Sequence, residues 1–361
     1  MALLLHRNYH LLFVNIPVRF PSVRFSNKVR KEKKRMDLSG FVLREGIRPK
    51  SEKFKGVLLR EYGPASSMSW SPLDELDYRL MATDVLIKIR ATSVNHFDVL
   101  LRSGYFARGQ KLQKPFILGK LTKTYFENNF YSGSDAAGII VQKGRQVTEF
   151  ELGDRVYTAI STKTGTYAKY CVASVLDGTV HALPDTVSFA EGACYGLPYF
   201  VAHRILAKLS RLPPRATLLV KGASGAVGNA LAQVGSALNL RVYGTAGSFN
   251  GQKSAKECGC LQVFNHVENS NEELVKLVKT RVGGVDLLVE SKPENLQSDL
   301  AMMKPGGRVI LLGPHEEKVQ LYLRPFLAKE VYLSGVNLAN AKVNDLFEVN
   351  NKRNQGRYNL N

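Results

Sequence analysis

The segment TLLVKGASGAVGNALAQVG, which begins at Thr217, places a short apolar strand, a glycine-rich turn and an amphipathic helix in immediate succession. In the turn, Ala223, Gly225 and Gly228 form an Ala-x-Gly-x-x-Gly variant of the dinucleotide-binding pattern. Small residues let the backbone approach a diphosphate, and the start of a helix offers unpaired N–H groups and a positive dipole end. The segment therefore predicts a strand–turn–helix unit that holds a dinucleotide, with a turn that merely packs tightly as the alternative.

The region from 188 to 340 alternates between short apolar runs and helix-like stretches. The runs are TLLV at 217, RVYG at 241, QVFN at 262, VDLLVE at 285, RVILLG at 308 and VYLSG at 331. The longest helix pattern places four apolar residues on one face, namely Val227, Leu231, Val234 and Leu238. Strands that alternate with helices predict parallel crossover units and a doubly wound sheet.

The preceding region is β-rich instead. Val85, Ile87 and Ile89 alternate along TDVLIKIRATSV, and GDRVYTAI and GTYAKYCVA predict two further strands. We therefore expect an α/β protein of two domains. The expected divisions are a basic leader at 1–50, a β-rich domain at 51–187, a doubly wound domain at 188–340 and an irregular tail at 341–361.

The end of the second predicted strand bears on the choice of dinucleotide. A dinucleotide with free ribose hydroxyls usually meets Asp or Glu about 20 residues after the glycine turn. Here that position is occupied by Gly247 and Ser248, followed by Lys253. Hydroxyl and ammonium groups can hold a 2′-phosphate, so the sequence favours NADPH over NADH. A solvated helix residue is the alternative for Lys253.

Charge and hydropathy bear on the cellular compartment of the protein and on membrane insertion. The formal net charge is +19, and the first 36 residues hold many Lys and Arg with Glu32 as the one acidic residue. This leader resembles an organelle transit peptide, which predicts a mitochondrial protein; a disordered leader or a start at Met36, in a cytoplasmic protein, is the alternative. Apolar runs fall short of the ~18 residues that a membrane helix needs, so no membrane insertion is expected.

Eight ordered motifs carry a family resemblance over about 54–340. They are VNHFDVLLRSG (94–104), GSDAAGII (133–140), ELGDRVY (151–157), GACYGLPYFVAHRIL (192–206), GASGAVG, GTAGSFNGQK (244–253), VFNHVE (263–268) and GGRVILLGP (306–314). Together they resemble the zeta-crystallin-like quinone oxidoreductases of the medium-chain dehydrogenase/reductase superfamily. The resemblance implies a GroES-like catalytic domain beside a Rossmann domain. It also implies NADPH as cofactor and quinones or other α,β-unsaturated carbonyls as substrates, in homodimers or homotetramers.

The resemblance also assigns residues to the cofactor. Ser224, Gly225, Ala226 and Val227 would hold the diphosphate, and Gly247 and His266 would lie near the adenosine, beside Ser248 and Lys253. Leu312, Gly313, Pro314 and His315 would border the nicotinamide ribose, with Val336, Asn337 and Leu338 beyond them. For His266 the alternative is an ordinary histidine at a strand end.

The catalytic chemistry asks little of side chains, because a reduced nicotinamide already stores the hydride. An acceptor oxygen that gains charge needs a donor, and Asn95 with Tyr105 are the best placed by motif. For Tyr105, packing at the rim is an equal alternative. His203 lies between apolar neighbours on a predicted helix and is expected to be structural.

Zinc is not expected. Zinc-dependent relatives carry Cys at the position of Asn95 and a His-Glu pair at Ser134 and Asp135, besides a run of four cysteines that this chain lacks. A soft cation needs thiolate or imidazole ligands. The pair Cys258 and Cys260 is expected to pack at a helix end.

Two segments depart from the family pattern. KLTKTYFENNFYS at 120–132 interrupts the catalytic domain, and the Asn-rich tail at 341–361 replaces the family's last part, so we expect a fold truncated at its C-terminus. Both segments would fit translated intron sequence. Leu100, Phe106 and Val201 also replace hydroxyl-bearing residues of close relatives.

Three hypotheses follow. The first is a zinc-independent, NADPH-dependent reductase of quinones or enones. The second is an NADPH-binding protein without efficient turnover, with RNA as a ligand that the basic balance would suit. The third is an incomplete gene product that folds poorly.

Overall fold

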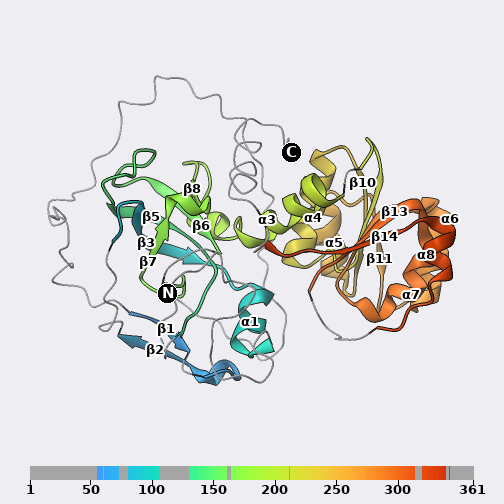
Figure 1. Ribbon diagram of the computed structural model, residues 1–361, viewed down its shortest axis with the longest axis horizontal. Coiled ribbons are helices and arrows are strands. Elements are labelled where there is room, and N and C mark those ends of the chain that lie inside the picture. Colours follow the sequence, from blue (N-terminus) through green and yellow to red (C-terminus); the bar gives the residue numbers. More distant parts are fainter. Residues whose placement is uncertain are drawn as a thin grey trace.

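A computed structural model of the chain describes residues 55–59, 61–72, 80–105, 130–160, 164–210, 212–313, 319–338 and 341. The basic leader, residues 120–129 and the tail beyond 341 lie outside the described residues, as do Phe106, Pro314 and His315. Figure 1 shows a β-rich half and an α/β half, with helix α3 between them.

The β-rich half contains two antiparallel sheets. A five-stranded sheet has the order β7-β3-β5-β6-β8, and a three-stranded sheet has the order β2-β1-β4. Their strands are β1 (Lys55–Leu59), β2 (Met68–Pro72), β3 (Asp84–Thr92), β4 (Phe130–Tyr131), β5 (Asp135–Lys143), β6 (Arg155–Ala159), β7 (Tyr170–Ser174) and β8 (Val180–Ala182). Helix α1 (His96–Arg102) follows β3 directly.

The predicted alternation along β3 is confirmed. Val85 and Ile87 are fully buried and pack in one cluster with the partly buried Ile89, whereas Leu86 belongs to a separate cluster. Successive side chains of a strand point to opposite faces, so the two faces of β3 serve two cores.

The end of the unusual segment at 120–132 is part of the fold. Phe130–Tyr131 forms β4, which pairs antiparallel with the edge of β1. The next residue, Ser132, accepts a hydrogen bond from the backbone N–H of Tyr167 at 2.9 Å. These three residues therefore take regular places beside β1, in a segment that the sequence marks as foreign to the family.

The α/β half is built on six parallel strands, as the alternating pattern predicts, and their order is β11-β10-β9-β12-β13-β14. The strands are β9 (Thr217–Val220), β10 (Arg241–Ala246), β11 (Gln262–Asn265), β12 (Val285–Glu290), β13 (Met303–Leu311) and β14 (Tyr332–Gly335). The order reverses between β9 and β12, and ligands of such sheets bind at this switch point, beyond the carboxyl ends of the strands.

Helices connect the halves and cover the parallel sheet. They are α2 (Phe189–Ala193), α3 (Leu197–His203), α4 (Ala226–Ala237), α5 (Phe249–Glu257), α6 (Asn271–Val282), α7 (Leu296–Asp299) and α8 (Arg324–Lys329). None of the helices in the described ranges is long and apolar enough to cross a bilayer. His203, at the end of α3, is buried as expected.

Three of the four apolar residues that the pattern places on one face of α4 pack into the core. Leu231 and Val234 are buried, and Val227 packs against the same cluster. Leu238 is 38% exposed. The helix ends at Ala237, and the backbone of Leu238 already leaves the helical conformation, so the periodicity of the helix no longer applies to this residue.

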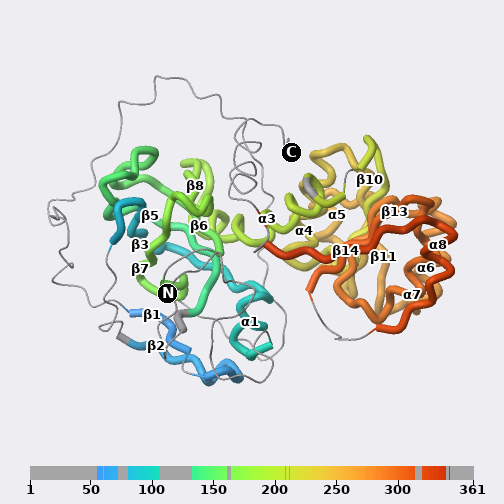
Figure 2. The backbone as a smooth tube through the Cα atoms, viewed as in Figure 1, coloured from blue at the N-terminus to red at the C-terminus, as the bar shows by residue number. Residues whose placement is uncertain are grey.

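One core spans the two halves. Leu101 of α1 and Ile160 after β6 belong to the same buried cluster as Phe200 of α3 and the sheet residue Leu218. A second cluster, which includes Leu274 of α6, covers the other side of the sheet. Figure 2 shows α3 leading from the β-rich half toward α4. The carboxyl edge of the parallel sheet is thereby held beside the β-rich half.

Candidate functional site

The glycine turn lies between β9 and α4 and is fastened to the end of β10. Gly222 has a φ of +75°, a conformation that glycine adopts without strain. Its N–H donates to the Thr245 hydroxyl at 3.1 Å, and the N–H of Ala223 donates to the Thr245 carbonyl at 2.8 Å. The turn is therefore held in place at the switch point by its own backbone.

The glycines of this turn serve different purposes. A Cβ on Gly228 would lie 2.3 Å from the carbonyl oxygen of Gly222 and 2.7 Å from the Cα of Ala223, so close packing of helix on turn demands glycine there. A Cβ on Gly225 would meet one atom, the Gly222 oxygen at 3.4 Å, which is ordinary contact. The φ of Gly225 is −78°, so neither protein packing nor backbone conformation requires this glycine. An open space for the close approach of a ligand explains it.

The start of α4 suits an anion. Its N-cap is Gly225, which offers no side-chain acceptor to the first-turn amides, and the helix runs for 12 residues. The first amides of a helix lack intrahelical acceptors and carry the positive end of the dipole. The residues that the resemblance assigns to the diphosphate, Ser224, Gly225, Ala226 and Val227, thus form a turn and helix start whose chemistry suits that anion.

The predicted adenosine residues gather at the next loop. Ser248 caps α5 by accepting a hydrogen bond from Gly251 at 3.1 Å. A Cβ on Gly251 would lie 3.1 Å from the hydroxyls of both Ser224 and Ser248, so the two serines flank the same point. Lys253 is exposed on α5, and residues 244–248 contain no carboxylate. This loop fits a phosphorylated ribose.

His266 closes the far side of that loop. A Cβ on Gly247 would lie 3.0 Å from its Nε2, and its Nδ1 lies 3.1 Å from the Thr245 hydroxyl. Burial lowers the pKa of His266, and the positive charges of Lys292 and Lys221 lower it further. The imidazole is therefore neutral at pH 7, and it braces the loop beside the expected adenosine.

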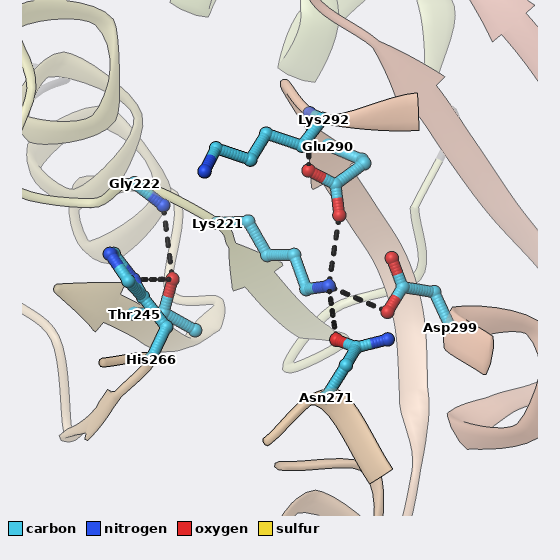
Figure 3. A network of polar contacts seen from close by, with 8 residues as sticks. All are labelled: Lys221, Gly222, Thr245, His266, Asn271, Glu290, Lys292 and Asp299. Atoms are coloured by element: carbon cyan, nitrogen blue, oxygen red, sulfur yellow. Dashed lines mark hydrogen bonds and ion pairs between the residues drawn. The ribbon is translucent and has the colours of Figure 1, made fainter. Parts of the chain in front are cut away.

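A buried ionic cluster lies beneath the turn, and sequence reasoning missed it. Lys221 Nζ contacts Asp299 Oδ1 at 2.6 Å, Glu290 Oε2 at 3.0 Å and Asn271 Oδ1 at 3.1 Å (Figure 3). Burial, and a hydrogen bond with Glu290, raise the pKa of Asp299 to about 8. The available signal was a charged residue at the end of each of two apolar runs, Lys221 after TLLV and Glu290 after VDLLV. Neighbouring parallel strands end side by side, so these two charges could be expected to meet.

The residues expected near the nicotinamide lie along the same sheet edge. The N–H of Leu312 donates to the Glu290 carbonyl at 2.8 Å, and the N–H of Val336 donates to the Leu311 carbonyl at 3.3 Å. Gly313 is exposed with a φ of +74°. Asn337 and Leu338 follow in the chain and are partly buried.

The two predicted catalytic donors flank α1. Asn95 is its N-cap, and Tyr105 follows three residues after its last residue, Arg102. Asn95 is buried, and its Nδ2 donates to Asp135 Oδ2 at 3.0 Å and to Ser93 Oγ at 3.3 Å. Both hydrogens of the amide are thus engaged within the protein.

A buried acid pair surrounds Asn95 and was also missed by sequence reasoning. Asp98 accepts hydrogen bonds from Ser134 Oγ at 2.5 Å, from Tyr167 OH at 3.0 Å and from the Asn95 N–H at 2.8 Å. Burial raises the pKa of Asp135 to about 8, and the nearby charge of Asp98 adds to the increase. Asp135 is therefore mainly neutral at pH 7.

These side chains do not fit zinc. Asn95, Ser134 and Asp135 supply an amide, a hydroxyl and a carboxyl group where a soft cation needs thiolate or imidazole. Asn95 Nδ2 donates to Asp135 Oδ2, and Ser134 Oγ donates to Asp98 Oδ1. Over the described ranges of the chain, His, Cys, Asp and Glu form no group of three that could hold a metal ion. Cys258 ends α5 and Cys260 is buried in the core, as expected for helix-end packing.

Comparisons with known proteins agree with this architecture. The family model of the alcohol dehydrogenase GroES-like domain matches residues 81–194, and that of the zinc-binding dehydrogenase matches residues 226–351. Two solved structures share the fold. The Escherichia coli quinone oxidoreductase complexed with NADPH has a TM-score of 0.68 and 20% identity, over 84% of this chain and 87% of that one. The CurK enoyl reductase has a TM-score of 0.69 and 22% identity, over 84% and 88%.

Curated relatives are closer in sequence. The quinone oxidoreductase of Mus musculus is 38% identical over 259 residues, which are 71% of this chain and 72% of the relative. The quinone oxidoreductase of Homo sapiens is 38% identical over 256 residues, or 70% of this chain and 71% of the relative. The two domains, the glycine turn at the switch point and these relatives together show that the chain belongs to the zeta-crystallin-like quinone oxidoreductases of the medium-chain dehydrogenase/reductase superfamily.

Proposed function

We propose that this oxidoreductase is an NADPH-dependent, zinc-independent reductase of quinones or other α,β-unsaturated carbonyls. The observation that carries the proposal is the open space over Gly225, at the switch point and before the uncapped start of α4. A diphosphate fills such a space and finds backbone donors there. A solved quinone oxidoreductase that shares this fold is described in complex with NADPH.

The selectivity for NADPH rests on the loop after β10. Ser248 and Lys253 offer a hydroxyl and an ammonium group, and no carboxylate of residues 244–248 would repel a 2′-phosphate. A dinucleotide without that phosphate would leave Lys253 without its anion. We therefore expect NADH to bind more weakly than NADPH.

The bound cofactor would supply the hydride, and the chain would supply position and protection from water. Asn95 is the proposed donor to the acceptor oxygen, and one of its N–H groups must leave Asp135 or Ser93 to serve it. Because Asp135 is mainly neutral at pH 7, its hold on that amide is weaker than that of a carboxylate. Tyr105 is the proposed second donor, from beyond the other end of α1.

Turnover with 9,10-phenanthrenequinone tests the proposal. We expect NADPH oxidation that depends on both the quinone and the protein, measured by the loss of NADPH absorbance. Tight NADPH binding without oxidation across several quinones and enones would contradict a reductase. It would favour a binding protein, for which RNA titration is the next measurement.

We also propose a homodimer, with a homotetramer as the alternative, through the edge of the parallel sheet. Strand β14 pairs with β13 alone among the described strands, and Tyr332 and Leu333 on it are exposed by 56% and 42%. An exposed strand edge with apolar side chains favours pairing with a second copy. Light scattering of the wild type and of Leu333→Lys tests this: the substitution should shift the protein toward the monomer.

The compartment is a separate proposal, because the leader lies outside the described residues. Its acid-poor, Arg-containing composition favours mitochondrial import. Import of the full chain into isolated mitochondria, with cleavage of the leader, is the expected result; a protein that stays outside would contradict the proposal.

A further inference from the structure

Lys292 follows β12 at the switch point, and neither the family pattern nor the glycine turn assigns it a role. Its backbone is fixed on both sides. The Lys292 N–H donates to Glu290 Oε1 at 2.6 Å, and the next residue, Pro293, is buried. Because Glu290 belongs to the buried ionic cluster, that cluster fixes the backbone position from which the Lys292 side chain extends.

The direction of the side chain is the second observation. In Figure 3, the Lys292 side chain extends toward the side of Gly222 and His266 and away from the Glu290 carboxylate. Its charge acts on His266, whose pKa it lowers after the larger effect of burial. A Cβ on Gly222 would lie 3.9 Å from Ser291 Oγ, so the end of β12 adjoins the turn itself.

The groups around Lys292 leave its positive charge without a compensating anion. Lys221 contacts both Glu290 and Asp299, and the raised pKa of Asp299 keeps that carboxyl group mainly neutral at pH 7, so the charge of Glu290 is already compensated. His266 is neutral at pH 7. Lys292 is exposed, and among the described residues its ammonium group has no anionic partner. A lone ammonium group beside a diphosphate-binding turn is complementary to phosphate.

We propose that Lys292 binds the phosphate on the nicotinamide side of the dinucleotide diphosphate. The sheet order supports this side: β12 lies on one flank of β9, whereas β10, with the loop that holds the adenosine residues, lies on the other. Lys292 and Lys253 then recognise different phosphates of one ligand. The inference rests on the proposed binding of NADPH.

The experiment measures the dissociation constants of NADPH, NADH and 2′,5′-ADP for the full chain by calorimetry. The variants are Lys292→Met, Lys253→Met and, as a control, Lys256→Met, which removes an exposed charge near the end of α5. Methionine keeps the aliphatic stem, and the backbone contact of residue 292 with Glu290 remains. Unchanged melting temperatures will show that the fold is intact.

For Lys292→Met, we expect NADPH and NADH to weaken by the same factor, roughly five- to twentyfold for one charge-assisted contact at an exposed site. The binding of 2′,5′-ADP, which lacks the nicotinamide-side phosphate, should not change. Lys253→Met should show the reverse pattern and weaken NADPH and 2′,5′-ADP while sparing NADH. Lys256→Met should change none of them.

Two results would overturn the inference while the proposed function stands: unchanged NADPH binding by Lys292→Met, or an equal loss of 2′,5′-ADP, which would indicate a diffuse field. Absence of NADPH binding by the wild type would overturn the proposed function together with this inference.

Discussion

The glycine turn of the parallel sheet and the start of α1 in the β-rich half differ in how their polar groups are used. At the turn, the first-turn amides of α4 have no capping side chain and the space over Gly225 is open. Around α1, the Asn95 amide donates to Asp135, and the Asp98 carboxylate accepts hydrogen bonds from Ser134 and Tyr167. The first surface is ready for a ligand, and the second is satisfied internally. Shape and the bound cofactor, more than free side-chain donors, should therefore orient the acceptor.

The largest expected effect separates the two glycines of the turn. Gly228→Ala should cost about 3 to 4 kcal/mol of unfolding free energy, because its Cβ would meet the backbone of Gly222 at 2.3 Å. Gly225→Ala should cost less than about 1 kcal/mol, because its Cβ meets ordinary contact. Urea denaturation of both variants measures this, and equal losses would contradict the distinction.

The ionic cluster beneath the turn comes next. Lys221→Met should lower the unfolding free energy by about 3 kcal/mol, because it leaves the Glu290 carboxylate buried beside Asp299 without its cation. Lys304→Met is the matched control, because the pair of Lys304 with Asp286 is more exposed and should be worth less than about 1 kcal/mol. Similar losses in the two variants would show that burial of the cluster is not decisive.

The acid pair near α1 should give the protein a characteristic pH dependence. The pKa of Asp135 is about 8 in the folded chain and 3.8 as an ordinary Asp, so the folded state binds more protons between these values. The contribution of Asp135 to stability therefore falls as pH rises from about 4 to about 8, by up to ~1.4 kcal/mol per pH unit. Asp135→Asn should flatten the profile measured by denaturation at several pH values. An unchanged slope would place the titration elsewhere.

The smallest expected effect concerns the acceptor. Asn95→Ala should lower kcat/KM for a quinone about tenfold and leave NADPH affinity unchanged, since one donor to a developing oxyanion is lost. Tyr105→Phe should lower it about two- to threefold, because Tyr105 lies beyond the far end of α1. A larger effect for Tyr105 would reverse the assignment of the donors.

The glycine turn could be predicted from the sequence, whereas the polar groups around α1 could not. The parallel sheet and the glycine turn were predictable, because alternating apolar runs and glycine spacing are local signals. The acid pair was not, because Asp98 and Asp135 are brought together by the pairing of β5 beside β3 and by α1. The exposure of Leu238 was missed because the pattern does not mark the end of α4.

Titration of NADPH into the full chain and into Gly225→Val tests the central claim most directly. We predict saturable binding by the wild type and at least a hundredfold weaker binding by the variant, with nearly the same melting temperature, since the added methyl groups would occupy the space of the diphosphate. Equal affinity of the two proteins would show that the cofactor does not lie over this turn.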